Sequence, residues 1–357
     1  MSEANKLAAE INEQLATLHD GAVSEDPFVW SDTEKDRRSR RETFAEVTKK
    51  LTSFVYISRA GTAVKILLGG TVAPLVLLAV LYLAEMPTDE NMRVWVWGCL
   101  VAIGVISIII AAVITHNPSI DSALCLAAYT VPRDWSFSSA NTDYAWATYQ
   151  NRFAYFNQGD EDQEIQCRMW GYMDRERKRP FQLFQFYFET VYYTTEVIRD
   201  AKGNMIGTRQ VKHEDPHYRY GMFAAMPESK VHFRIAENSG TDFDTTIALE
   251  YGALNKAMNI GCNAKDELAV RQFLSPAVQE VIMKLSEDCA GLHMDFYPGL
   301  VLVVTENNFL DAVKEITLDK NARRFAETIK PAGDLIERFG GALVEGLDKI
   351  RKYNDNY

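Results

Sequence analysis

The sequence predicts an α+β fold, in which an N-terminal transmembrane helical hairpin precedes a mostly antiparallel sheet domain with flanking helices. Two apolar runs, Ile66 to Ala84 and Val94 to Thr115, carry no charge, and helices of that length span a hydrocarbon core of about 30 Å. The alternative is a pair of buried core helices, but long soluble helices normally carry a polar stripe. After Glu164, crowded aromatic and β-branched residues indicate strands, and helical periodicity returns in the last third.

Three regions follow from this division. Residues 1–63 are predicted to form a cytoplasmic N-terminal helical region with a basic juxtamembrane segment, and residues 64–116 the transmembrane hairpin. Residues 117–357 are predicted to form a cytoplasmic α+β domain that ends in an amphipathic helix. Nine basic residues against three acids lie between Lys35 and Lys65, so the positive-inside rule places both termini in the cytoplasm.

Charge and cysteine content exclude some classes of function. The chain has a net charge of −11, and residues 117–357 carry 27 Lys and Arg against 35 Asp and Glu. Such an acidic domain is poorly suited to nucleic acid. The five cysteines are far apart and odd in number, which predicts reduced thiols and neither a metal site nor a disulfide framework.

The first part of the chain predicts short helices around the apolar runs. Ala4 to His19 has one apolar stripe and is typical of a docking or pairing helix. Ala22 to Glu34 lacks periodicity and is expected to link. Arg40 to Ser58 predicts a basic helix, which either lies on anionic lipid or is an ordinary basic flank of the span. Ser119 to Tyr129 is expected to begin another helix after Pro118.

The middle of the chain predicts a sheet. Phe181 to Ile198 indicates one long strand or a strand pair, turned at Asp200 to Asn204 and followed by Met205 to Val211. Further strands are expected at Gly221 to Ala225 and Val231 to Ala236.

The last third combines helices with one hairpin. Asp266 to Cys289 predicts a helix that Pro276 interrupts. Leu292 to Tyr297 and Leu300 to Thr305, joined by Pro298 and Gly299, predict a tight hairpin. Asn321 to Tyr353 predicts a long amphipathic helix. Its apolar stripe either packs on its own domain or pairs with a second copy (Leu335, Phe339, Leu343, Leu347 and Ile350).

Three polar segments are candidate sites. His213 to His217 has metal-binding residue types, but Pro216 and the lack of a third ligand favour a polar turn. Gly159 to Asp162 favours a solvated acidic loop over a calcium site. Asp174 to Arg179 favours an exposed turn between strands over a site for lipid phosphate or an acidic partner. We assign no catalytic, cofactor-binding or metal-ligating residue and no cofactor, and we find no motif that argues for an enzyme.

Several segments resemble an uncharacterised bacterial family, domain of unknown function family 3137. They are Tyr218 to Ala224, Val270 to Ala277, Met294 to Val304, and Asn308 with Phe309. Val270 and Ser275 depart from the family pattern, which has Ala and Thr there. The resemblance implies a two-pass protein of the bacterial inner (plasma) membrane, and it brings no catalytic residues.

The first functional hypothesis is a membrane-anchored cytoplasmic interaction or regulatory domain, which binds a protein through its sheet edge or terminal helices. The alternative is a membrane-tethered domain that binds a small ligand or lipid, because its Phe and Tyr residues could line a pocket. An oligomeric pore or a hydrolase ranks below both. The expected partners are the lipid bilayer and either another protein or further copies of this chain.

Overall fold

The computed structural model describes residues 3–18, 23–30, 32–54, 65–66, 102, 105–110, 118–199, 201, 203, 205–237, 243–318 and 325–354. The chain forms two compact units. The first comprises Met1–Asn12, Thr48–Asp121 and Glu315–Phe325, and the second comprises Glu13–Val47, Ser122–Lys314 and Ala326–Tyr357. We describe each unit by itself.

The first unit contains a small two-stranded sheet and the ends of two helices. Strand β1 (Ser119–Ile120) pairs antiparallel with β11 (Ile316–Thr317). Helix α1 (Glu3–Ala16) begins in this unit, and helix α2 (Glu34–Ser53) ends in it. The Lys50 ammonium lies 2.8 Å from the Glu10 carboxylate. Both helices were predicted, although α2 begins before Arg40.

The predicted transmembrane hairpin needs correction. In the part of the chain that the structure describes, no helix combines the length and the apolar character needed to cross a membrane. Between residues 64 and 116, the described helical pieces are 65–66, 102 and 105–110, and six helical residues rise only about 9 Å. Nearly all of Ile66 to Ala84 and Val94 to Thr115 lies outside the described residues. This finding contradicts the hairpin, the two-pass character and the inner-membrane placement predicted above.

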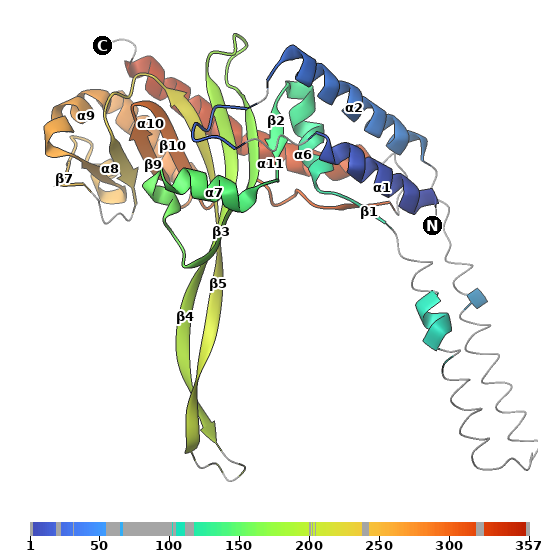
Figure 1. Ribbon diagram of the computed structural model, residues 1–357. Coiled ribbons are helices and arrows are strands. Elements are labelled where there is room, and N and C mark those ends of the chain that lie inside the picture. Colours follow the sequence, from blue (N-terminus) through green and yellow to red (C-terminus); the bar gives the residue numbers. More distant parts are fainter. Residues whose placement is uncertain are drawn as a thin grey trace, which may run out of the picture. The chain divides into compact units, whose positions relative to one another are not determined.

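The second unit is built on a nine-stranded sheet (Figure 1). Its strand order is β2-β3-β4-β5-β10-β9-β6-β8-β7, and every neighbouring pair is antiparallel. The strands are β2 (Ser136–Ser138), β3 (Glu161–Tyr172), β4 (Pro180–Arg199), β5 (Met205–Met226), β6 (Phe233–Ala236), β7 (Thr245–Thr246), β8 (Asn259–Cys262), β9 (His293–Tyr297) and β10 (Gly299–Thr305). The α+β class with a mostly antiparallel sheet is therefore confirmed.

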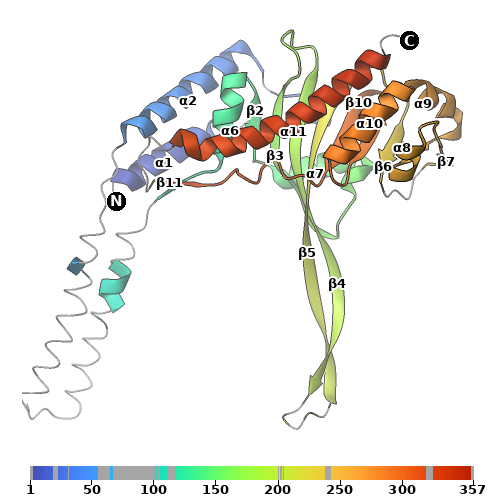
Figure 2. The ribbon, with the colours of Figure 1, turned by 180° about the vertical axis from the view of Figure 1, so that it is seen from behind.

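Helices cover both faces of this sheet. Helix α7 (Thr142–Gln150) and the 3-10 helix η3 (Ala154–Phe156) pack on one face, where Phe153 and Phe156 meet Phe223 and Phe184. Helix α10 (Pro276–Asp288) and helix α11 (Phe325–Asn354) lie on the other face (Figure 2). The remaining helices are α6 (Ala123–Thr130), α8 (Gly252–Ala257) and α9 (Glu267–Phe273), with the 3-10 turns η2 (Val131–Arg133) and η4 (Ala264–Asp266).

Most predicted elements of the last third are confirmed. The helix from Asp266 is split before Pro276 into α9 and α10, and β9 and β10 form the predicted hairpin. Phe339, Leu343, Leu347 and Ile350 of α11 are buried within the chain itself, and the Phe339 ring stacks on Phe309 at 4.5 Å. The stripe therefore packs on its own domain, so this face offers no surface for a second copy.

Candidate functional site

The most distinctive surface of the second unit is a two-stranded arm. Strand β3 follows β4 only as far as Glu189, and β10 follows β5 only from Tyr220 onward. Beyond these points, within the described part of the chain, β4 and β5 pair only with each other. We call this extension, Thr190 to Arg199 with Met205 to Arg219, the arm; it projects out of the sheet in Figures 1 and 2.

Local sequence explains why the arm forms. Its β4 half is rich in aromatic and β-branched residues, which favour strands. Cross-strand contacts join the two halves: the Tyr192 ring stacks on His213 at 5.0 Å, and Arg209 Nη2 lies 2.8 Å from Glu196 Oε2. Gly203 has a φ of +86° in the turn between the strands, a conformation that glycine adopts without strain. The predicted hairpin around residues 200–204 is thereby confirmed.

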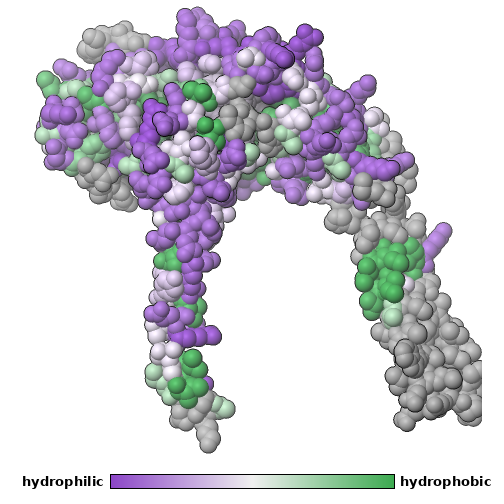
Figure 3. Space-filling model, in the orientation of Figure 1, coloured by the Kyte–Doolittle hydropathy of each residue, from purple (hydrophilic) through white to green (hydrophobic). Residues whose placement is uncertain are grey.

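The arm exposes apolar side chains on both faces. Successive side chains of a strand point to opposite faces, so Tyr193 and Val197 of β4 lie on one face, and Tyr192 and Ile198 on the other. All of these are exposed, as are Met205 and Ile206 near the turn. In Figure 3, apolar surface gathers toward the end of the arm. Two isolated strands are at best marginally stable in water, so this surface is suited to being covered.

Hydrogen bonds at the base of the arm show which backbone groups face outward. Asp160 N–H donates to Glu189 C=O at 2.7 Å, and Val191 N–H donates to Asp160 Oδ2 at 2.8 Å. Glu189 and Val191 therefore point their backbone groups away from β5. Because orientation alternates along a strand, Tyr193, Thr195, Val197 and Arg199 do the same. In the part of the chain that is described, no strand pairs with this edge.

The opposite edge, on β5, differs in one important respect. Pro216 pairs with Glu189, so its missing N–H lies on the outer edge of β5. A proline and a lysine, Lys212, on an outer edge are devices that oppose strand addition. The β4 edge of the arm carries neither residue type. The two edges of the arm are therefore unequal, and the β4 edge is the one open to strand addition.

The structure relocates the sequence-predicted polar segments. His213 to His217 lies within β5, so the prediction of a turn is wrong; His213 stacks on Tyr192 and His217 on Phe188. Among the described residues, no group of His, Cys, Asp or Glu could hold a metal ion. The predicted acidic loop at Gly159 to Asp162 is loop only at Gly159 and Asp160, because Glu161 and Asp162 are the exposed first residues of β3. Glu161 pairs with Lys212 at 2.6 Å.

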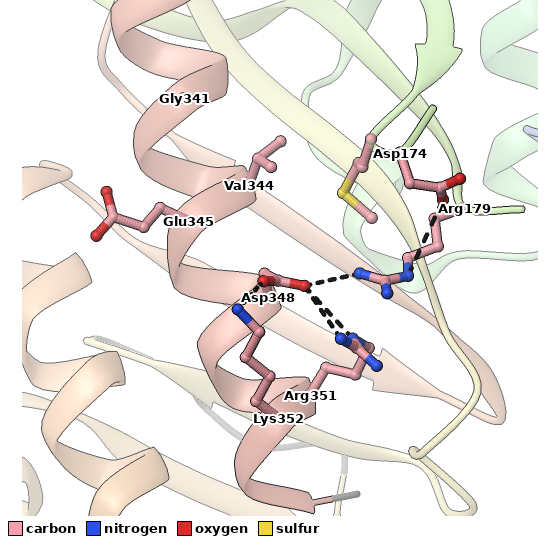
Figure 4. A pocket seen from close by; sticks show the side chains of 9 residues that line it. Asp174, Arg179, Gly341, Val344, Glu345, Asp348, Arg351 and Lys352 are labelled. Atoms are coloured by element: carbon pink, nitrogen blue, oxygen red, sulfur yellow. Dashed lines mark hydrogen bonds and ion pairs between the residues drawn. The ribbon is translucent and has the colours of Figure 1, made fainter. Parts of the chain in front are cut away.

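The segment Asp174 to Arg179 forms the predicted turn, between β3 and β4. A groove of about 450 Å³ lies between this turn and the last turns of α11 (Figure 4). Arg179 Nη1 and Lys352 Nζ each lie 2.7 Å from the carboxylate of Asp348. Hydrogen bonds from Lys352 and then Arg179 lower the pKa of Asp348.

The groove has no net charge of its own. Its three basic residues are balanced by three acidic ones: Arg179, Arg351, Lys352, Asp174, Glu345 and Asp348. The positive charges already share a carboxylate, so they favour neither an anionic nor a cationic ligand. We therefore interpret the groove as a structural link between α11 and the β3–β4 turn.

A buried polar cluster surrounds Asp295 of β9, which is fully buried. Arg234 Nε donates to Asp295 Oδ1 at 2.9 Å, and the ring of His293 lies 3.3 Å from Oδ2. Burial acts to raise the pKa of Asp295, but the interactions with His232, His293 and Arg234 outweigh it, and the pKa lies well below its ordinary value. The cluster contains no hydroxyl or thiol nucleophile from serine or cysteine, and we interpret it as a structural ion pair.

The four cysteines among the described residues show no sign of nucleophilic chemistry. Cys125, Cys167, Cys262 and Cys289 are free and buried. Burial raises the pKa of the Cys167 thiol to about 12 and that of Cys289 to about 11. Thiols with such pKa values remain protonated at neutral pH and are poor nucleophiles.

Comparison with known proteins identifies no relative: no protein-family model matches the chain, and no curated protein or solved structure matches it either. The resemblance noted from the sequence therefore stays a prediction. Sequence reasoning found the hairpin but missed that it extends beyond the sheet. The signal was the length of the strand pattern from Phe181 to Ile198, which exceeds an ordinary strand of five or six residues.

Proposed function

We propose that this chain is a protein-interaction module and that its arm is the element that contacts the partner protein. The observation that carries the proposal is the exposure of large apolar side chains on both faces of a two-stranded ribbon. Exposed aromatic and aliphatic residues in one contiguous region are typical of binding surfaces. Tyr192 and Tyr193 supply rigid aromatic contacts, and Ile206, which is 65% exposed, lies near the turn.

The charge of the arm is consistent with an apolar contact. Arg209 is neutralised by Glu196, and Lys212 by Glu161 and Glu214 at 2.6 and 2.7 Å. At these positions a partner therefore meets paired charges, which cost less to desolvate than unpaired ions.

The alternative of a small-ligand site has less support. The aromatic residues that suggested a pocket, including Phe184, Phe186 and Phe223, are completely buried against one another and η3. They form a packed core, which needs no ligand.

Site-specific photo-crosslinking tests the proposal. A photoreactive phenylalanine analogue at Tyr193, 61% exposed on the arm, should give a discrete protein adduct. The same analogue at Tyr144, 66% exposed on α7, is the matched control and should not give that adduct. Identical adducts at both positions, or adducts with lipid alone, would contradict the proposal.

A variant with a shortened arm provides a second test. Tyr192 and His213 are directly opposite in the ladder and form a hydrogen-bonded pair, because their backbone groups face each other. An Asn-Gly turn can therefore join them in place of residues 193–212. The shortened chain should keep its thermal unfolding transition, because the sheet core is untouched. The shortened chain, with the photoreactive analogue at Val191, should not give the protein adduct that the full-length chain gives with the analogue at Tyr193.

A further inference from the structure

We infer that the partner of the arm is a second copy of this chain, paired antiparallel along the free edge of β4 with Thr195 opposite its own equivalent. This inference rests on the proposed function and specifies its partner. It follows from three properties of the segment Val191 to Arg199: its free backbone groups, the order of its side chains, and its charge.

The backbone groups define which residues can pair. Tyr193, Thr195 and Val197 direct their N–H and C=O groups outward on the β4 edge, as shown above. In an antiparallel pair, outward-facing residues oppose one another as hydrogen-bonded pairs. A two-fold axis at Thr195 places Tyr193 of one copy opposite Val197 of the other, and the ladder then uses the outward-facing groups of Tyr193, Thr195 and Val197 in both copies.

The order of side chains makes the segment self-complementary. Two aromatic residues precede Thr195, and two β-branched residues follow it (Tyr192, Tyr193, Val197 and Ile198). The same axis therefore places Tyr192 opposite Ile198 and Tyr193 opposite Val197 of the other copy. Pairs of an aromatic and a β-branched residue are among the favourable cross-strand pairs. The exposed apolar residues on both faces are thereby partly covered.

The charges fit the same register. Glu196 faces Thr194 of the other copy and is neutralised within its own arm by Arg209. Arg199 of one copy lies opposite Val191 of the other, whose N–H is already bound to the carboxylate of Asp160. The basic end of each β4 segment thus reaches the acidic segment Gly159 to Asp162 of the other copy. Moving the axis by one residue, between two equivalents of Glu196, would oppose like charges.

Paired proline substitutions in the full chain test the edge. Thr195 directs its N–H outward on β4, and Thr208 does so on β5, so proline at either position spares the β4–β5 ladder. By sedimentation equilibrium, the unsubstituted chain should dimerise. Thr195→Pro should weaken dimerisation at least ten-fold, and Thr208→Pro should leave it unchanged. A monomeric parent chain, or loss of the dimer with Thr208→Pro alone, would overturn the inference.

Cysteine and charge-swap variants test the register independently of proline. Opposed residues of a hydrogen-bonded pair have Cα atoms about 5.5 Å apart, within the range of a disulfide. Oxidation of Thr195→Cys should therefore give a covalent dimer, and Thr208→Cys should not. Arg199→Asp and Asp160→Arg should each weaken the dimer, and an equimolar mixture of the two should recover a heterodimer; failure of the mixture to associate would reject the register.

The two proposals fail in distinguishable ways. If the Tyr193 crosslinker captures a different protein while the chain sediments as a monomer, the interaction module stands and the self-pairing is wrong. If the Tyr193 crosslinker captures no protein and the chain is monomeric, both proposals are wrong.

Discussion

The sheet half and the arm half of β4 both carry residues that favour strands, but they have very different surroundings. In the sheet half, Phe184 and Phe186 are completely buried beneath η3, with β3 and β10 on either side. In the arm, Tyr192 and Tyr193 occupy the same kind of strand and are exposed. In β4, the sheet half is rich in phenylalanine, and the arm half is rich in tyrosine, threonine, valine and isoleucine, all of which favour strands. The difference shows that strand propensity sets the length of a hairpin, whereas neighbouring strands and helices decide which part becomes core.

The largest expected difference between the two halves is in the free energy of unfolding when one aromatic side chain is truncated. Phe184→Ala should lower the free energy of unfolding by about 3–5 kcal/mol, because it leaves a cavity in a packed aromatic cluster. Tyr192→Ala, the control in the arm, should change it by less than about 0.5 kcal/mol. Urea denaturation followed by circular dichroism measures both. Equal destabilisation would mean that the arm belongs to the cooperative core.

The buried ion pair of the sheet gives an effect of similar size that depends on pH. Asp295→Asn leaves the buried guanidinium of Arg234 without its counter-charge and should cost about 3–5 kcal/mol at neutral pH. The pKa of Asp295 is lowered on folding, so its contribution is complete above the unfolded pKa of about 4. That contribution is lost as the pH falls through the folded pKa.

Denaturant titrations at several pH values measure this dependence. The difference in stability between the parent chain and Asp295→Asn should shrink in acid. Glu280→Gln, at an exposed position on α10, is the control and should show no such difference. If the difference in stability between the parent chain and Asp295→Asn stays constant down to strongly acidic pH, Asp295 acts through packing and not through its charge.

Two glycines of β5, one in the sheet half and one in the arm, allow the two halves of the hairpin to be compared within one strand. A Cβ atom on Gly221 would lie 2.3 Å from Phe184 Cζ and 2.8 Å from the carbonyl oxygen of Val303. Gly221→Ala should therefore destabilise by about 1–3 kcal/mol. Gly207 in the arm has open space around it, so Gly207→Ala should be neutral or stabilising by up to about 1 kcal/mol. Thermal melts of the two variants compare them directly, and a destabilising Gly207→Ala would reveal an unrecognised contact on the arm.

Local patterns predicted the elements of the second unit well, because each has a local cause. Pro276 divides α9 from α10, and Pro298 with Gly299 turns β9 into β10. Tertiary features had no such signal. The burial of Asp295 depends on Arg234, 61 residues away, and the exposure of Tyr193 depends on where β3 begins. His213 to His217 was assigned to a turn because polar residues and a proline usually mark one; on an unpartnered outer edge, a strand tolerates both.

The apolar runs illustrate a different limit of sequence reasoning. Ile66 to Ala84 and Val94 to Thr115 meet the length criterion for spanning helices. The corresponding helix is absent from the described residues, and both runs lie almost wholly outside them. Hydropathy measures the preference of side chains for an apolar environment over water, and it does not establish that the segment forms one continuous helix.

The smallest expected effect concerns the ion pair between Glu196 and Arg209. Both side chains are about half exposed, and such pairs contribute roughly 0.2–1 kcal/mol locally. Because no third strand among the described residues of the chain pairs with the arm, it should open without the sheet. Glu196→Gln should therefore leave the free energy of global unfolding unchanged, while hydrogen exchange of arm amides becomes up to about five-fold faster. Glu345→Gln, which breaks the Glu345–Lys349 pair of α11, is the control and should not affect the arm.

Hydrogen exchange measured over a range of protein concentrations sharpens the comparison between the two edges of the arm. If two copies pair along β4, the amides of Thr195 and Val197 become more protected as concentration rises, and those of Thr208 and Gln210 do not. Uniform, concentration-independent exchange along both edges would show that the arm remains an uncovered two-stranded ribbon.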